Sequence, residues 1–230
     1  MILHHVVARA VTTGPQHHFF GYYDKTPWDL TGRYMLALET TFHDREPTGD
    51  DVAVVGLIDT AEDNAWRPLA ESNAWCFQQG NMLQWLPSAP DRLVVFNTRI
   101  EGRFVAVVLD VFTGRTRELP RPVYAVSPDG KSALSLNFAR IAHTRPGYGY
   151  VGVEDPGRND PRPTDDGIFW MDLETGQSRL IISLAQIAEY EPDASMAEGV
   201  HWFNHLLFNP DGSRFVFLHR WHRPGQPRPW

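Results

Sequence analysis

The segment NPDGSRFVFLHRW, residues 209–221, contains the pattern that decides the fold. Its Asp-Gly pair supplies the positive φ of a hairpin tip, and the side chains that follow, from Arg214 to Phe217, alternate between two faces. Residues 29–40 and 127–138 have the same pattern, and residues 83–99 carry a weaker copy in which Ala-Pro-Asp replaces Asp-Gly. The sequence therefore predicts four related β-hairpins.

A second pattern falls between these hairpins. An apolar strand ends in Asp, and a turn and a further strand follow, in residues 55–70, 106–119 and 168–182. Asp59, Asp110 and Asp172 occupy equivalent places in the three copies. The last two copies contain Thr-Gly in the turn, and glycine suits the left-handed position of a hairpin loop.

The two patterns alternate along the chain, which predicts an all-β fold built from four-stranded antiparallel blades. One blade cannot bury both of its faces, whereas blades stacked radially as a β-propeller bury the faces between neighbours. Residues 1–230 then form a single partial propeller of about three and a half blades. The fourth hairpin is not followed by the second pattern, so the fourth blade lacks its outer half. We therefore expect an incomplete ring, and we expect the chain to be a truncated product or a fragment. The alternative is a four-bladed ring that residues 3–12 complete.

An insertion interrupts the third blade. Residues 141–167 are rich in Pro, Gly and Asp, so we expect them to leave the blade as an extended loop over the mouth of the central channel. A short helix is expected within residues 182–192, where Leu184, Ile187 and Ala188 have helical spacing and Pro192 ends the run.

Composition excludes several classes of partner. The net charge of −7 opposes binding to a nucleic-acid backbone. The sequence has neither an apolar run of about 18 residues nor an N-terminal export signal, so we expect no membrane association and a cytoplasmic location. The single cysteine, Cys76, forbids an intramolecular disulfide and fits a reducing compartment.

Residues 17–40 and 201–221 resemble the inner hairpins of WD-repeat-like bacterial propellers of the TolB-like and oligogalacturonate lyase type. In the second segment, His205, the Pro-Asp-Gly turn and His219 match an inner-strand histidine, a hairpin tip and a second-strand histidine of the lyase family. The whole chain also resembles the N-terminal part of a bacterial propeller family that has no assigned reaction. The lyase resemblance implies a manganese ion held by histidines and a glutamine, most of which come from late blades.

Histidines are the candidate metal ligands. His18, His205 and His219 lie where inner strands should open toward the channel, and imidazole suits manganese and other divalent metals. A metal beside an acidic sugar could acidify the adjacent C–H for β-elimination. The alternative is that these histidines are hydrogen-bonded within a polar channel.

The segment FFGYYDKTPWD, residues 19–29, is the candidate saccharide-binding strand. Tyr23 and Trp28 could stack on sugar rings while Asp24 and Lys25 bond hydroxyl or carboxylate groups. The alternative is that the aromatic side chains fill the wedge between two blades.

Four further polar residues complete the candidate site. Gln79 and Asn81 carry amides that suit hydroxyl-rich ligands, although amides also satisfy backbone groups between blades. Arg140 and Arg145, beside the insertion, could pair with a carboxylate or phosphate, although arginines in loops are often simply solvated.

The sequence favours a propeller that binds a carbohydrate-related small molecule, either without catalysis or as a metal-assisted polysaccharide lyase or hydrolase. The alternative is a non-catalytic scaffold whose blade loops bind a protein partner. The lyase hypothesis requires several of His18, His205, His219 and Gln79 to lie within metal-bonding distance of one another, whereas a scaffold would scatter them.

Overall fold

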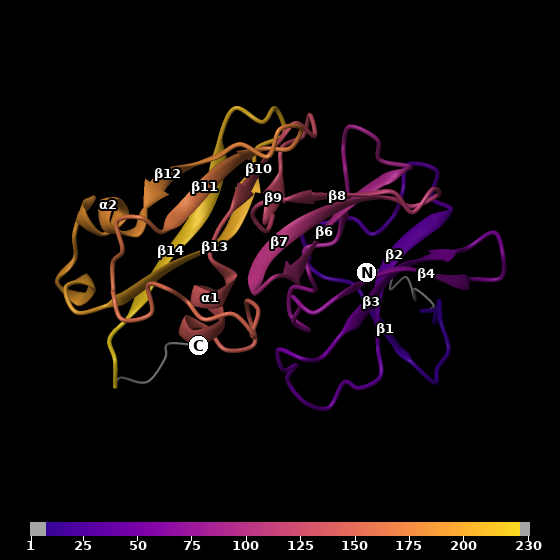
Figure 1. The fold of residues 1–230 in the computed structure, drawn as a ribbon, viewed down its shortest axis with the longest axis horizontal. Coiled ribbons are helices and arrows are strands. Elements are labelled where there is room, and N and C mark those ends of the chain that lie inside the picture. The colour runs from indigo at the N-terminus through magenta and orange to yellow at the C-terminus, as the bar shows by residue number, and fades with distance from the viewer. Residues whose placement is uncertain (1–7, 226–230) are drawn as a thin grey trace, which may run out of the picture.

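The computed structural model describes residues 8–225, and its strands form three and a half blades of a β-propeller (Figure 1). Three sheets have four antiparallel strands in chain order, and the last has two. The first blade consists of β1 (His17–Phe19), β2 (Tyr34–Thr40), β3 (Ala53–Asp59) and β4 (Ala65–Ser72). The second consists of β5 (Gln84–Trp85), β6 (Leu93–Ile100), β7 (Arg103–Asp110) and β8 (Thr116–Leu119). The third consists of β9 (Ala125–Val126), β10 (Ser132–Ser135), β11 (Gly167–Asp172) and β12 (Ser178–Ser183), and the half-blade consists of β13 (Val200–Phe208) and β14 (Phe215–His222).

Each of the three four-stranded blades has an aspartate at the end of its third strand, as the sequence predicts. Asp59, Asp110 and Asp172 are the last residues of β3, β7 and β11. The Asp110 carboxylate accepts hydrogen bonds from the backbone N–H groups of Phe112 and Thr113, at 3.0 and 3.1 Å, and so shapes the turn. Arg33, which precedes β2, donates two hydrogen bonds of 2.7 Å to Asp59. This contact links the start of the second strand to the end of the third.

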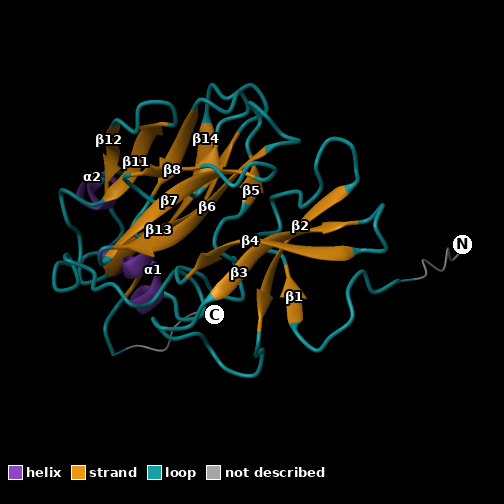
Figure 2. Ribbon diagram, turned by 45° about the vertical axis from the view of Figure 1, so that its right-hand side comes forward, coloured by secondary structure: helices purple, strands orange, loops and turns teal. Residues whose placement is uncertain are grey.

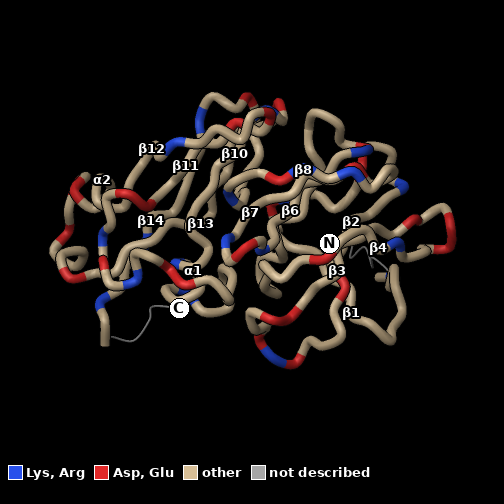
Figure 3. The backbone as a smooth tube through the Cα atoms, in the orientation of Figure 1, with Lys and Arg blue, Asp and Glu red and all other residues tan. Residues whose placement is uncertain are grey.

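The second blade shows how the blades stack. Val94, Phe96, Val107 and Leu109 pack with the side chains of the first blade, whereas Val95, Ala106 and Val108 pack with the third blade and half-blade. The side chains of β6 and β7 therefore alternate between two buried faces, because successive residues of a strand point to opposite sides of its sheet. Charged residues gather in the turns and loops (Figure 3).

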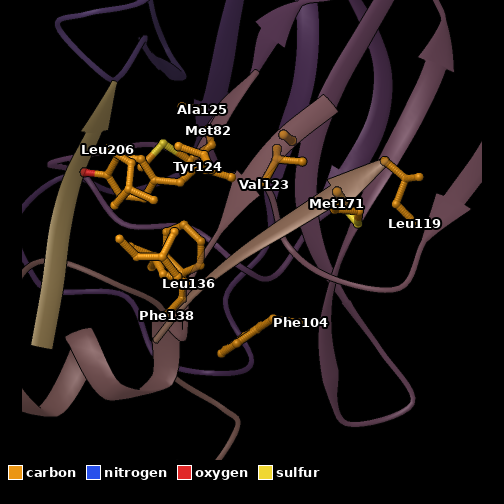
Figure 4. Close-up of a cluster of buried hydrophobic side chains, with 14 of the residues drawn as sticks. Met82, Phe104, Leu119, Val123, Tyr124, Ala125, Leu136, Phe138, Met171 and Leu206 are labelled. Carbon is orange, nitrogen blue, oxygen red and sulfur yellow. The ribbon is translucent and has the colours of Figure 1, made fainter. Parts of the chain in front are cut away.

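The larger core cluster joins the second blade, the third blade and the half-blade (Figure 4). Tyr124 and Phe138 are fully buried there, and their rings stack with centroids 5.8 Å apart. The Tyr124 ring lies next to Leu206 of β13. Tyr124 therefore belongs to the apolar core, and its hydroxyl contacts residues of the site described below.

Two short helices interrupt the strands (Figure 2). Helix α2 (Leu184–Glu189) confirms the expected helix, and its capping box joins Ser183 and Gln186. Helix α1 (Phe138–Thr144) was not predicted, and residues 141–144 are helical instead of extended because the Asn137 side chain caps the N-terminus of α1. A 3₁₀ turn spans Ala194–Met196. Within residues 8–225, no helix is long and apolar enough to cross a membrane.

The half-blade has the two strands that the repeat predicts. In the part of the chain that the structure describes, β14 pairs with β13 alone. Residues 8–12 form no strand, and residues 3–7 of the segment considered for closing the ring lie outside the described residues.

Candidate functional site

The first strands of the second blade, third blade and half-blade line a cavity of about 340 Å³. Its walls include Gln84 and Trp85 of β5, Ala125 and Val126 of β9, and Leu207 and Phe208 of β13. Residues 24–26, which follow β1, close the remaining side. Because the innermost strands of the blades surround it, we call this space the axial cavity.

A second cavity of about 290 Å³ adjoins the axial cavity. Tyr22, Tyr23 and His205 line it together with apolar residues of β13 and β14, and Asp24 and Leu207 line both cavities. We call it the tyrosine cavity. Tyr23 is 76% exposed, and its ring centroid lies 4.3 Å from that of Tyr22.

A close backbone approach positions this pair of tyrosines. A Cβ on Gly21 would lie 2.9 Å from the backbone carbon of Gln79 and the backbone nitrogen of Gly80. Only glycine lets the segment after β1 approach the 79–80 turn of the second blade so closely. The sequence FFGYYDK therefore places its tyrosines at the axis because a glycine precedes them.

A bulge in β13 turns His205 into the same region. The register of β13 and β14 shifts between Asn204 and Leu207, and His205 adopts the left-handed conformation with φ of 55°. His205 Nδ1 lies 3.3 Å from the Tyr22 hydroxyl oxygen. The His205 and Tyr22 side chains thus meet although they come from opposite ends of the described chain.

The Tyr124 hydroxyl joins three parts of the propeller. It accepts a hydrogen bond of 2.8 Å from the Gln79 side-chain amide and one of 2.9 Å from the His205 backbone N–H. Gln79 precedes β5, Tyr124 precedes β9, and His205 belongs to β13. Hydrogen bonds between neighbouring blades therefore fix the floor of the site.

The electrostatic environment keeps these groups neutral near pH 7. Burial raises the pKa of Tyr22 and Tyr124. Burial lowers the pKa of His205, with contributions from the positive charges of Arg220 and Arg145. A neutral imidazole and neutral phenols can exchange hydrogen bonds with hydroxyl groups of a ligand in either direction.

Part of the insertion lies close to His205. The ring centroid of Tyr148 lies 6.5 Å from that of His205, and the Arg145 guanidinium lies over the Tyr148 ring at 4.1 Å. Arg220 on β14 donates a hydrogen bond of 3.2 Å to the Asn204 side chain. Arg145 and Arg220 are close enough that Arg145 contributes to the lowered pKa of Arg220.

Asp24 and Lys25 form an ion pair at the axial cavity. Lys25 Nζ lies 3.0 and 3.2 Å from the two Asp24 carboxylate oxygens. The side chains are nearly enclosed, with 6% of Lys25 and 10% of Asp24 exposed. Burial lowers the pKa of the Lys25 amine, although the Asp24 carboxylate opposes this effect.

The three histidines predicted as metal ligands have different neighbours. His18 Nε2 lies 3.0 Å from a Glu39 carboxylate oxygen, His205 lies beside Tyr22, and His219 Nε2 lies 2.8 Å from His201 Nδ1. In residues 8–225 no group of three His, Cys, Asp or Glu side chains could hold a metal ion. Gln79 and His205 come together around Tyr124, whereas His18 and His219 do not join them.

Two other predicted ligand-binding residues lie apart from the two cavities. Trp28 is 40% exposed and its backbone bridges to Met35. Asn81 is fully buried, and its amide donates to the Asn97 carbonyl at 3.3 Å. Neither side chain lines either cavity.

Arg140 holds the insertion against β13 instead of facing a ligand. Its guanidinium is 2% exposed and donates to the carbonyls of His201, Gly157, Asp160 and Pro161 and to the Asp155 carboxylate, at 2.6–3.3 Å. All five N–H donors of an arginine are accounted for by these five contacts. The interpretation of Arg140 as a carboxylate or phosphate ligand is therefore replaced by a structural role.

Sequence reasoning missed Tyr124, Tyr148 and Arg220. Tyr124 carries one available signal, since it immediately precedes the inner strand of the third blade in the repeat. Arg220 carries no comparable signal, because its position depends on how β13 and β14 pack against the insertion.

The fold is a β-propeller, and it is similar to the propellers of TolB and of oligogalacturonate lyases. TolB from Acinetobacter baumannii superposes on this chain with a TM-score of 0.51 at 12% identity. The match covers 94% of this chain and 40% of TolB. An oligogalacturonate lyase from Vibrio parahaemolyticus superposes with a TM-score of 0.56 at 13% identity, covering 94% of this chain and 50% of the lyase.

A further solved structure, an oligogalacturonate lyase in complex with manganese, has a TM-score of 0.52 at 15% identity and matches 94% of this chain and 63% of the lyase. The chain thus spans between about two fifths and two thirds of the length of these structures. No protein-family model and no curated protein sequence matches the chain. At these identities the similarity shows the fold.

Proposed function

We propose that this propeller binds a carbohydrate at the tyrosine cavity, with the insertion forming one side of the site. The main support is that side chains from different blades meet beside a cavity of about 290 Å³. These residues are Tyr22, Tyr23, Gln79, Tyr124 and His205. An aromatic face next to neutral hydrogen-bonding groups matches a sugar ring, which has apolar C–H faces and hydroxyl edges.

The exposed Tyr23 ring supplies the stacking surface in this proposal. Tyr23 packs against Tyr22 on one side and lies 6.1 Å, between ring centroids, from His205. The His205 imidazole and the Tyr22 hydroxyl supply hydrogen bonds to sugar hydroxyls. Arg220 and Arg145 add to the lowering of the His205 pKa that burial causes, so their positive charges lie near His205 and favour sugars that carry a carboxylate.

A manganese ion fits these residues poorly. His205 Nδ1 is held by the Tyr22 hydroxyl, and His219 Nε2 is held by His201. Because the three predicted histidines do not gather, the described residues do not make a manganese site, and the proposed binding uses no metal. Manganese as a cofactor of this protein stays a prediction from resemblance alone.

Calorimetric titration of the protein with two soluble oligosaccharides tests the proposal. One is an oligogalacturonide and the other is an uncharged cello-oligosaccharide of equal length. We expect saturable binding, tighter for the oligogalacturonide because of the two arginines. If neither sugar nor any member of a wider saccharide panel binds, the carbohydrate proposal is wrong, and the protein-interaction scaffold becomes the better hypothesis.

A further inference from the structure

Lys25 places a primary amine in the wall of the axial cavity. Its side chain is 6% exposed, and the described hydrogen-bond partner of its Nζ is the adjacent Asp24. Trp85, Ala125, Val126 and Phe208 make much of the remaining wall apolar. The sequence contains one other lysine, Lys131, which is exposed in the turn before β10.

Burial shifts the Lys25 amine toward its neutral form, although the Asp24 carboxylate opposes this shift. Removing an ammonium group from water disfavours its charged form, and the Lys25 pKa is lowered for that reason. The groups that face it are the Asp24 carboxylate and the Tyr124 ring, whose centroid lies 5.9 Å from Nζ. Desolvation is one of the environments that make a lysine amine nucleophilic, and the Asp24 carboxylate is placed to accept a proton from it.

We propose that Lys25 is a nucleophilic amine that forms a reversible imine with a small aldehyde entering the axial cavity. The cavity volume of about 340 Å³ accommodates a small aldehyde such as an open-chain sugar of three or more carbons. This inference concerns the axial cavity and does not depend on saccharide binding at the tyrosine cavity.

The reaction needs no further reagent. The nitrogen lone pair of the neutral amine attacks the aldehyde carbon, and the C=O π electrons move to oxygen. Asp24 accepts one proton from the nitrogen and passes it to this oxygen, which gives a neutral carbinolamine. The second nitrogen proton moves by way of Asp24 to the carbinolamine hydroxyl as the C–O bond breaks, so that water leaves and the C=N bond forms. The net change is aldehyde plus amine to imine plus water.

The protein's two lysines provide an internal comparison for the test. The protein is incubated with glyceraldehyde and sodium cyanoborohydride, and each modified residue is quantified by peptide mass spectrometry, with the α-amino group of Met1 read separately. We expect Lys25 to be labelled about tenfold faster than Lys131. Labelling of Lys25 at the same rate as Lys131, or slower, would overturn the inference.

A variant checks that the fast labelling belongs to Lys25. Lys25→Arg leaves no primary amine at position 25, so the fast-labelled fraction should vanish while the rate at Lys131 stays unchanged. Circular dichroism establishes whether the variant is folded. If it is not, the comparison of Lys25 with Lys131 in the unmodified protein decides the question without it.

Discussion

The Tyr124 hydroxyl oxygen lies 2.9 Å from the His205 backbone nitrogen and accepts its hydrogen bond. The two residues are 81 positions apart and belong to neighbouring units of the propeller. His205 sits at the bulge of β13, where the strand cannot supply a regular ladder partner. Tyr124 therefore satisfies the backbone group that the bulge releases, and it fixes the direction of the His205 side chain.

Replacing Tyr124 with Phe should destabilise the protein by about 2 kcal/mol or more, because two buried N–H donors lose their acceptor. The donors are those of Gln79 and His205. Urea denaturation followed by circular dichroism measures the change. The matched control is Tyr190→Phe, since Tyr190 is 69% exposed and should tolerate the loss of its hydroxyl. Equal stability of the two variants would contradict the proposed role of Tyr124.

The Arg140 contacts predict that this buried side chain holds the insertion in place. Arg140→Met should cost about 3–5 kcal/mol, because it leaves the Asp155 carboxylate buried without its guanidinium partner. It should also speed cleavage within residues 145–166 during limited proteolysis. The control, Arg158→Met, changes an exposed arginine of the same loop. If both variants are cleaved at the rate of the unmodified protein, the insertion does not depend on Arg140.

The His201–His219 pair predicts a loss of stability in mild acid. The His201 Nε2–H donates to the Met196 carbonyl, so His201 Nδ1 accepts from His219 and both rings are neutral. Burial and the neighbouring His201 lower the pKa of His219 from its ordinary value of 6.5 to about 4. The folded state therefore resists protonation that the unfolded state accepts, and the stabilising contribution, present above pH 6.5, is lost as the pH falls toward 4.

Urea denaturation at several pH values between 7 and 4 measures this dependence. His219→Gln should flatten the decline of the unfolding free energy with falling pH, whereas His43→Gln, which changes an exposed histidine, should leave the slope unchanged. The same slope in the His219→Gln variant and the unmodified protein would show that the pair does not control the acid response.

The sequence predicts the blades well because their signals are local. Asp59, Asp110 and Asp172 each bond within their own turn or to a strand of the same sheet, so the repeat of turn residues reveals the strand order. Helix α1 was missed because the Asn137 cap adjoins a segment whose Pro and Gly content resembles a loop.

The site is harder to predict because its residues meet across blades. Gln79 and His205 were both predicted as site residues and meet at Tyr124 in the structure, yet this common partner lies between them in sequence without a distinctive motif. Arg140 is a residue type that often binds anions, but its donors are already paired with four backbone carbonyls and the Asp155 carboxylate, and sequence cannot show which donors are paired. Contacts between blades depend on strand register, bulges and loop packing, which are known only from the folded structure.

The most direct test of carbohydrate binding compares two tyrosines by isothermal titration with an oligogalacturonide. Tyr23 lines the tyrosine cavity, whereas Tyr190 is similarly exposed at the end of α2 and lines neither cavity. We predict that Tyr23→Ala weakens binding about tenfold, equal to about 1.4 kcal/mol, and that Tyr190→Ala leaves the dissociation constant unchanged. An unchanged dissociation constant for Tyr23→Ala would contradict the assignment of the site.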